Sequence, residues 1–293
     1  MHDRQRGLLL TALGVLLLSP DALVLRWLAT DAMQILSWRG LLMAGGLALL
    51  LLARYRSSLP AKLWQCGRTG LACAVCYGVS TICFVHAMML AGAANTLLIF
   101  STTPLIAAAL GWFWLGERPP LRTLVAILVC LGGVALIVSD ESPGSSPVGN
   151  LYAFAATILL AANFTLARSR PLIDMSPALL LGALLASVIA FAIGGPPTLS
   201  GDQLLGLSLM SGLLLPLGFM LVQLGPRSIS ATEVGLLFLL EVVLGPLWVW
   251  WLLGEAPSPT VLAGGAIVLL ALFGHALAGW QKSGTERTRS GRT

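Results

Sequence analysis

The chain has 293 residues, of which 57% are hydrophobic and only 10% are charged, and its mean hydropathy is +0.90. Because soluble domains carry about 25% charged residues, this composition excludes an ordinary soluble protein and makes the lipid bilayer the expected partner. The net charge of +5 does not indicate a nucleic-acid partner, because the basic residues gather at the ends of apolar stretches.

Ten apolar stretches of helical length follow one another along the chain. Each has roughly 20 residues, which is the length that a helix needs to cross about 30 Å of hydrocarbon. They lie at about 7–27, 31–53, 68–90, 94–115, 120–139, 148–169, 177–195, 203–225, 230–253 and 258–280. The sequence therefore predicts an all-α integral membrane protein with ten transmembrane helices.

The basic residues predict the orientation of these helices. If the N-terminus is cytoplasmic, every Lys and Arg except Arg26 and Arg39 falls at a cytoplasmic end of a stretch. An excess of basic residues on the cytoplasmic side is the usual rule for membrane proteins. We therefore predict that both termini are cytoplasmic, with residues 283–293 forming a cytoplasmic tail.

The chain also repeats itself, which suggests a duplicated unit. The segment 98–119 matches 236–257 at an offset of 138, and both copies end in Leu-Gly-Glu-x-Pro. A second match, at an offset of 142, relates Asp21 to Asn163. We predict two five-helix repeats, 1–142 and 143–282. Because five crossings reverse the chain, the second repeat is expected to be inverted, with a central cavity at the repeat interface.

The third stretch contributes the first candidate site residues. Tyr77, Ser80, Thr81 and Phe84 follow the spacing of one helical face near the middle of the membrane. This face offers aromatic rings and hydroxyls to a small amphipathic solute. The alternative is that the hydroxyls bond back to their own helix.

Prolines mark two further candidate positions. Ser101 and Thr102 precede Pro104, which frees a backbone carbonyl about one turn earlier. Hydroxyls and a free carbonyl suit an ammonium group, whereas the alternative is a kink satisfied by its neighbours. Gly212 and Pro216 allow the same two interpretations, and here we favour a hinge.

The ninth stretch contributes Phe238 and Glu241, and Glu241 is the acid nearest the centre of any stretch. A charged group in lipid is costly, so it usually faces a cavity or another protein group. Glu241 is therefore expected to carry a proton during exchange, to pair with a substrate amine, or to act as a structural acid.

Three more polar residues are assigned to structure or gating. Asp21 follows Pro20 and is expected to form an ion pair with Arg39, because pairing reduces the cost of burial. Asn163 occupies the equivalent position in the second repeat.

Two motifs resemble those of the EamA-type members of the drug/metabolite transporter superfamily. They are the Trp38-Arg39 pair and the pattern S-T-T-P-L…L-G-E-x-P-P that begins at Ser101. The resemblance implies a ten-helix exporter of small metabolites in the bacterial inner membrane. In length and topology the chain is similar to aromatic amino-acid exporters of the YddG type.

These observations predict a secondary transporter that exports amino acids, aromatic ones in particular, by alternating access. A channel or passive scaffold is the main alternative. An integral membrane enzyme is disfavoured, because the three histidines are scattered and the five cysteines suit packing better than metal binding. We therefore expect no cofactor, no metal site and no catalytic residue, and the sequence does not indicate an oligomeric state.

Overall fold

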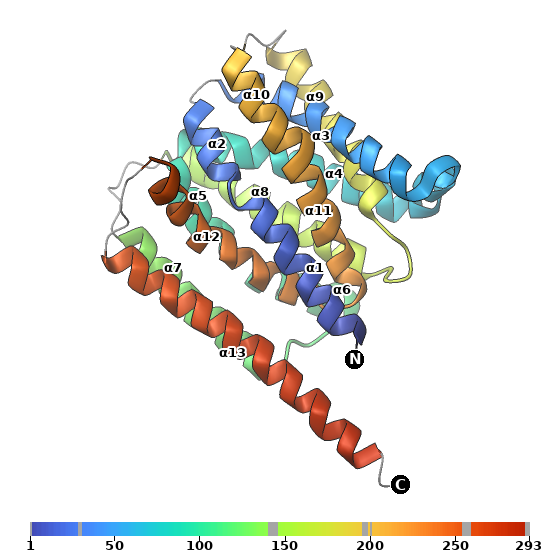
Figure 1. Cartoon of the computed structure of the whole chain (residues 1–293), viewed down its shortest axis with the longest axis vertical. Coiled ribbons are helices and arrows are strands. Elements are labelled where there is room, and N and C mark those ends of the chain that lie inside the picture. Colours follow the sequence, from blue (N-terminus) through green and yellow to red (C-terminus); the bar gives the residue numbers. More distant parts are fainter. Residues whose placement is uncertain are drawn as a thin grey trace.

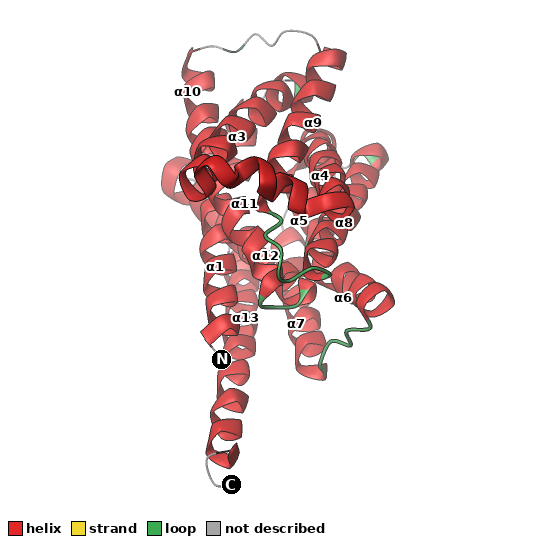
Figure 2. Ribbon diagram, turned by 90° about the vertical axis from the view of Figure 1, so that its right-hand side faces the viewer, coloured by secondary structure: helices red, strands yellow, loops and turns green. Residues whose placement is uncertain are grey.

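The computed structural model describes residues 2–28, 31–139, 146–194, 199, 201–253 and 259–290. Every regular element in these ranges is helical (Figure 2). The α-helices are α1 (His2–Leu18), α2 (Asp21–Leu28), α3 (Ala32–Tyr55), α4 (Leu59–Leu90), α5 (Gly92–Phe100), α6 (Thr103–Leu115), α7 (Leu121–Ser139), α8 (Pro147–Arg168), α9 (Ser176–Gly194), α10 (Gly201–Leu209), α11 (Leu215–Leu224), α12 (Ala231–Leu253) and α13 (Pro259–Ser290). Two 3₁₀ turns, η1 (Arg56–Ser58) and η3 (Gly225–Arg227), and one π-helical turn, η2 (Met210–Leu214), join or interrupt them.

The helices agree with the predicted membrane spans. Six helical segments of the described chain are long and apolar enough to cross a bilayer, and one of them, Ala32–Leu90, covers both α3 and α4. Shorter apolar segments lie within α7 and α13. The predicted all-helical membrane fold is confirmed. In Figure 1 the start of α1 and the end of α13 lie at the same end of the molecule, as expected for an even number of crossings.

Three of the predicted spans are interrupted near a proline. Pro20 separates α1 from α2, and Pro104 follows the break between α5 and α6. The π-helical turn η2 comes just before Pro216 in α11. Proline removes one backbone donor and clashes with the preceding turn, which accounts for breaks at these positions.

Two helices extend beyond their predicted spans. α4 begins at Leu59, with a kink at Gly67, where φ is +55°. α13 continues as helix to Ser290, past the predicted end near residue 280. Hydropathy marks only the apolar part of a helix, so polar extensions escape it. The predicted boundary between the repeats, at 142/143, lies outside the described residues.

The packing of the helices relates the two halves of the chain to each other. α4 packs against α8, and the equivalent helices α11 and α1 pack in the same way. α3 packs against its equivalent α9, and α7 against α13. The last pair lies along one side of the molecule (Figure 1). Exchange of the halves therefore maps the packing pattern onto itself, as expected of two related units.

Close backbone contacts repeat under the same exchange. A Cβ added to Gly46 would lie 2.1 Å from Gly212 O, and one added to Gly182 would lie 2.6 Å from Ala74 O. Gly212 and Ala74, whose carbonyl oxygens make these contacts, are repeat equivalents at the offset of 138, and the two glycines that meet them lie on the equivalent helices α3 and α9. Only glycine allows helices to approach this closely, so both halves use it at the same point.

Candidate substrate site

A cavity lies at the centre of the helices, and both halves of the chain line it. Its volume is about 30 Å³, measured by the centres of a water-sized sphere. One water needs about 10–15 Å³ by this measure, so the cavity has room for a few waters and not for a metabolite. In this structure the site is therefore too narrow to hold a metabolite.

The lining shows the same twofold relation as the packing. Four pairs of lining residues are repeat equivalents, at offsets of 138 or 142: Leu18 and Leu160, Tyr77 and Leu215, Thr81 and Phe219, and Phe100 and Phe238. Equivalent residues of two related repeats can surround a single space only if that space lies on the axis that relates the repeats. The cavity thus lies at the interface of the two repeats.

The candidate face of α4 lines this cavity. Tyr77, Ser80, Thr81 and Phe84 are all lining residues. The Ser80 hydroxyl does not bond back to its own helix but donates to Ala156 O of α8, at 2.8 Å. Tyr77 is buried, with its hydroxyl 2.9 Å from the Met43 sulfur. Tyr77 and Phe84 therefore offer rings to the cavity, and Thr81, whose hydroxyl interacts with that of Tyr77, lines the same wall.

The hydroxyls beside Pro104 are used locally instead. Ser101 donates to Leu98 O at 2.6 Å, and Thr102 donates to Ile99 O at 2.7 Å. The carbonyl oxygen of Phe100, which Pro104 leaves without a backbone donor, accepts a hydrogen bond from the Thr103 hydroxyl. The kink is thus satisfied by its neighbours, which differs from the expected free carbonyl for an ammonium group.

Ser101 and Thr102 also differ from each other in position. Ser101 lines a small pocket next to the cavity, together with Phe238 and Glu241. Thr102 lines neither space. Because a hydroxyl in a helix can always reach a carbonyl three or four residues earlier, the sequence alone could not decide between the two uses.

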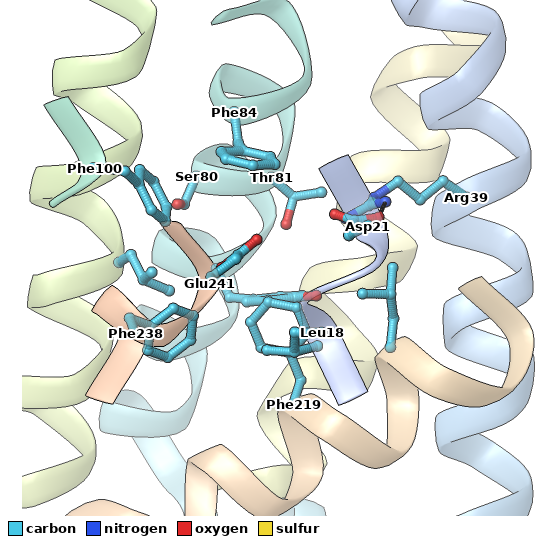
Figure 3. A pocket seen from close by; sticks show the side chains of 13 residues that line it. Leu18, Asp21, Arg39, Ser80, Thr81, Phe84, Phe100, Phe219, Phe238 and Glu241 are labelled. Atoms are coloured by element: carbon cyan, nitrogen blue, oxygen red, sulfur yellow. Dashed lines mark hydrogen bonds and ion pairs between the residues drawn. The ribbon is translucent and has the colours of Figure 1, made fainter. Parts of the chain in front are cut away.

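Asp21 and Arg39 form an ion pair on the wall of the cavity (Figure 3). Both terminal nitrogens of Arg39 donate to the Asp21 carboxylate, and the Nη2–Oδ2 distance is 2.7 Å. The two residues are 3% and 4% exposed. The remaining Arg39 nitrogen, Nε, is buried without a hydrogen-bond partner in the described chain. The ion pair expected from the sequence is present, and it engages both terminal nitrogens of the guanidinium group.

Glu241 projects from α12 into the cavity (Figure 3) and is 5% exposed. Within the residues that the structure describes, no hydrogen bond or ion pair involves its carboxyl group. Phe238, one turn earlier on α12, lines the same space and packs against Phe164 with ring centres 5.4 Å apart. Glu241 is thus a buried acid that faces a hollow and not a partner.

The remaining predicted residues lie away from the lining. Asn163 of α8 exchanges two hydrogen bonds with Gln223 of α11, at 3.0 and 3.3 Å, and both side chains are buried. Gly212 and Pro216 face Gly46 of α3 across the close helix contact described above. All three residues join helices and do not contribute to the cavity wall.

The sequence analysis missed several lining residues, namely Leu18, Phe100, Leu160, Leu215 and Phe219. A signal for three of them was available. Moving Tyr77, Thr81 and Phe238 by the repeat offset of 138 gives Leu215, Phe219 and Phe100. Leu18 and Leu160 are related by the offset of 142, but nothing in the sequence identifies Leu18 as a lining residue.

At the end of the molecule that holds the N-terminus, ion pairs join the two halves. Arg4 pairs with Glu233 at 2.5 Å, and Arg168 pairs with Glu117 at 2.9 Å. Arg54 and Asp174 are 3.6 Å apart. In each pair one partner precedes residue 140 and the other follows residue 146. We call these three pairs the N-terminal-side latch, because the halves cannot separate there without breaking them.

The fold and the cavity define a class of protein: multi-pass membrane proteins whose two related halves enclose a central cavity. The model of the EamA-like transporter family matches the chain twice, over residues 5–139 and 147–276. The chain therefore belongs to the EamA-like transporter family, whose members are transporters and not enzymes.

One solved structure, titled only "Crystal structure of protein", is similar to the chain with a TM-score of 0.74 and 18% sequence identity. The similarity covers 92% of this chain and 96% of that one, and at this identity it supports the fold alone. No curated protein matches the sequence.

Proposed function

We propose that the protein is a secondary transporter that exports small, partly apolar metabolites by alternating access through the central cavity. The observation that carries this proposal is a narrow central cavity between two repeats, lined by equivalent residues from each. Rocking of the halves about the axis through the cavity would expose the same residues first on one side and then on the other.

The lining supports amino acids as the first substrates to test, with aromatic ones favoured. Tyr77, Phe84, Phe100 and Phe238 offer rings on which an apolar side chain can stack. Phosphorylated substrates fit poorly, because phosphate recognition needs free Arg or Lys groups and Arg39 is held by Asp21. The similarity to aromatic amino-acid exporters of the YddG type points the same way.

We further propose that the protein lies in a bacterial inner membrane with both termini in the cytoplasm. The support is the distribution of Lys and Arg along the sequence. This orientation puts the N-terminal-side latch on the cytoplasmic side. Labelling of a cysteine placed in 283–293 by a membrane-impermeant maleimide added outside intact cells would contradict it.

Solute counterflow in proteoliposomes tests the transport proposal. Vesicles loaded with unlabelled phenylalanine or tryptophan are expected to accumulate the labelled amino acid transiently, with a rate that saturates with concentration. A carrier gives this result because each half-cycle exchanges one bound solute for another. Protein-free vesicles are the control. Flux that rises linearly with concentration and needs no internal solute would instead support a channel, and no flux for any member of an amino-acid panel would refute the proposal.

A further inference from the structure

We propose that Glu241 binds the ammonium group of an aromatic amine, and that the cavity prefers such amines to the corresponding zwitterionic amino acids. This inference rests on the proposed function, because it names the chemistry that the same cavity selects. It is carried by three features of the lining: an acid without a partner, a set of aromatic rings around it, and a cation that is already engaged.

The acid is available to a ligand. Only 5% of Glu241 is exposed, and its carboxyl group points into the cavity (Figure 3). No hydrogen bond or ion pair of this carboxyl exists among the residues described. A buried carboxyl group without a partner is unfavourable, so a ligand that supplies a cationic donor would relieve this cost.

Aromatic rings surround the same space. Phe84, Phe100, Phe219 and Phe238 all line the cavity together with Glu241 (Figure 3). Phe84 and Phe100 pack with ring centres 5.0 Å apart, and Phe219 packs edge-on against Tyr77, also at 5.0 Å. Cations bind to the faces of such rings, and the attraction grows when water is excluded. The rings thus suit both the cationic head and the aromatic body of an arylalkylamine.

The cavity offers nothing comparable to a carboxylate. Arg39 is the one basic residue in the described lining, and both of its terminal nitrogens donate to Asp21. Its third nitrogen, Nε, is buried. A bound zwitterion would therefore bring a second acid into a wall that already holds Asp21 and Glu241, and it would lose its hydration without a replacement. An amine without a carboxylate avoids this cost.

Four probes with the same ring isolate the two charges. They are 2-phenylethylamine, phenylalanine, 3-phenylpropionate and 2-phenylethanol, which are cationic, zwitterionic, anionic and neutral. Binding to the purified full-length protein in detergent is measured by calorimetry. We expect 2-phenylethylamine to bind at least tenfold more tightly than phenylalanine, and 3-phenylpropionate to bind more weakly than either.

Variants separate recognition from a structural role. Glu241→Gln is expected to weaken 2-phenylethylamine at least tenfold while leaving the affinity for neutral 2-phenylethanol unchanged. Asp202→Asn removes an acid from an exposed position in α10 and is expected to leave all four affinities unchanged. Glu241→Asp, which keeps the charge, should retain most of the preference for the amine.

Several results would overturn the inference. Phenylalanine that binds as tightly as the amine would show that the carboxylate is accommodated. If Glu241→Gln weakens the binding of the amine and of the alcohol equally, Glu241 is a structural acid. If Glu241→Gln leaves the affinity for the amine unchanged, the carboxyl group does not bind the ammonium. Phenylalanine counterflow without any preference for the amine sinks this inference and leaves the proposed function intact. Amine binding without counterflow of any solute would refute the proposed transport function and leave this inference intact.

Discussion

Arg39→Gln is expected to lower the free energy of unfolding by about 3–5 kcal/mol, since it leaves the Asp21 carboxylate buried without its partner. The ion pair is bidentate and both residues are almost fully buried, so bulk water does not solvate the carboxylate that remains. Thermal unfolding of the purified protein in detergent, followed by intrinsic tryptophan fluorescence, measures the effect as a fall in Tm.

Removal of both charges is the control for this prediction. Asp21→Leu combined with Arg39→Leu is expected to unfold close to the wild-type temperature, because a buried ion pair adds little beyond a well-packed apolar pair. A double variant that is as unstable as the sum of two destabilised single variants would show that the loss comes from packing and not from an unpaired charge.

Gly46→Ala is expected to be the second most damaging change. The added Cβ would lie 2.1 Å from Gly212 O and 2.6 Å from the Pro216 ring, so α3 must move away from η2 and α11. Overpacking of this kind costs about 1–3 kcal/mol, and the movement also disturbs the bend that carries Leu215 to the cavity. We expect a lower Tm in the same unfolding assay.

Gly45 provides a matched control one residue away. A Cβ on Gly45 would meet nothing within 4 Å, and alanine favours the helix over glycine by up to about 1 kcal/mol. Gly45→Ala should therefore unfold at or above the wild-type temperature. Equal stability of the two alanine variants would mean that the close contact between α3 and η2 does not constrain the packing.

Much of the fold could be predicted, because a bilayer imposes simple rules on a chain. Helical length and hydropathy located the spans, and the prolines at 20, 104 and 216 marked where three of them break. The polar start of α4 and the polar end of α13 were missed, since hydropathy does not register helix outside the apolar region.

The candidate site was harder to predict, because it depends on contacts between distant segments. The helical spacing of Tyr77, Ser80, Thr81 and Phe84 was enough to place one face of α4 at the cavity. The use of the Ser101 hydroxyl was not predictable, because a carbonyl in its own helix and a ligand compete for it on equal terms. The pairs that join residues far apart, such as Arg4 with Glu233, leave no pattern in a single sequence.

The N-terminal-side latch links the central cavity to the proposed transport cycle. Arg4–Glu233, Arg54–Asp174 and Arg168–Glu117 all connect one half to the other at the same end of the molecule. If the halves rock, these contacts break each time the cavity opens toward that end. A covalent link in place of one of them should therefore stop the cycle without touching the cavity.

Cross-linking across the latch is the most direct test of alternating access. The protein carries Arg4→Cys and Glu233→Cys in a background without its five native cysteines, and a short thiol-specific cross-linker with a reducible bond joins them. The matched control joins Lys62→Cys to Gln65→Cys, which lie within α4 alone. We predict that the first link abolishes counterflow, that reduction restores it, and that the second link leaves it unchanged. Full counterflow with the halves linked at Arg4 and Glu233 would contradict alternating access between them.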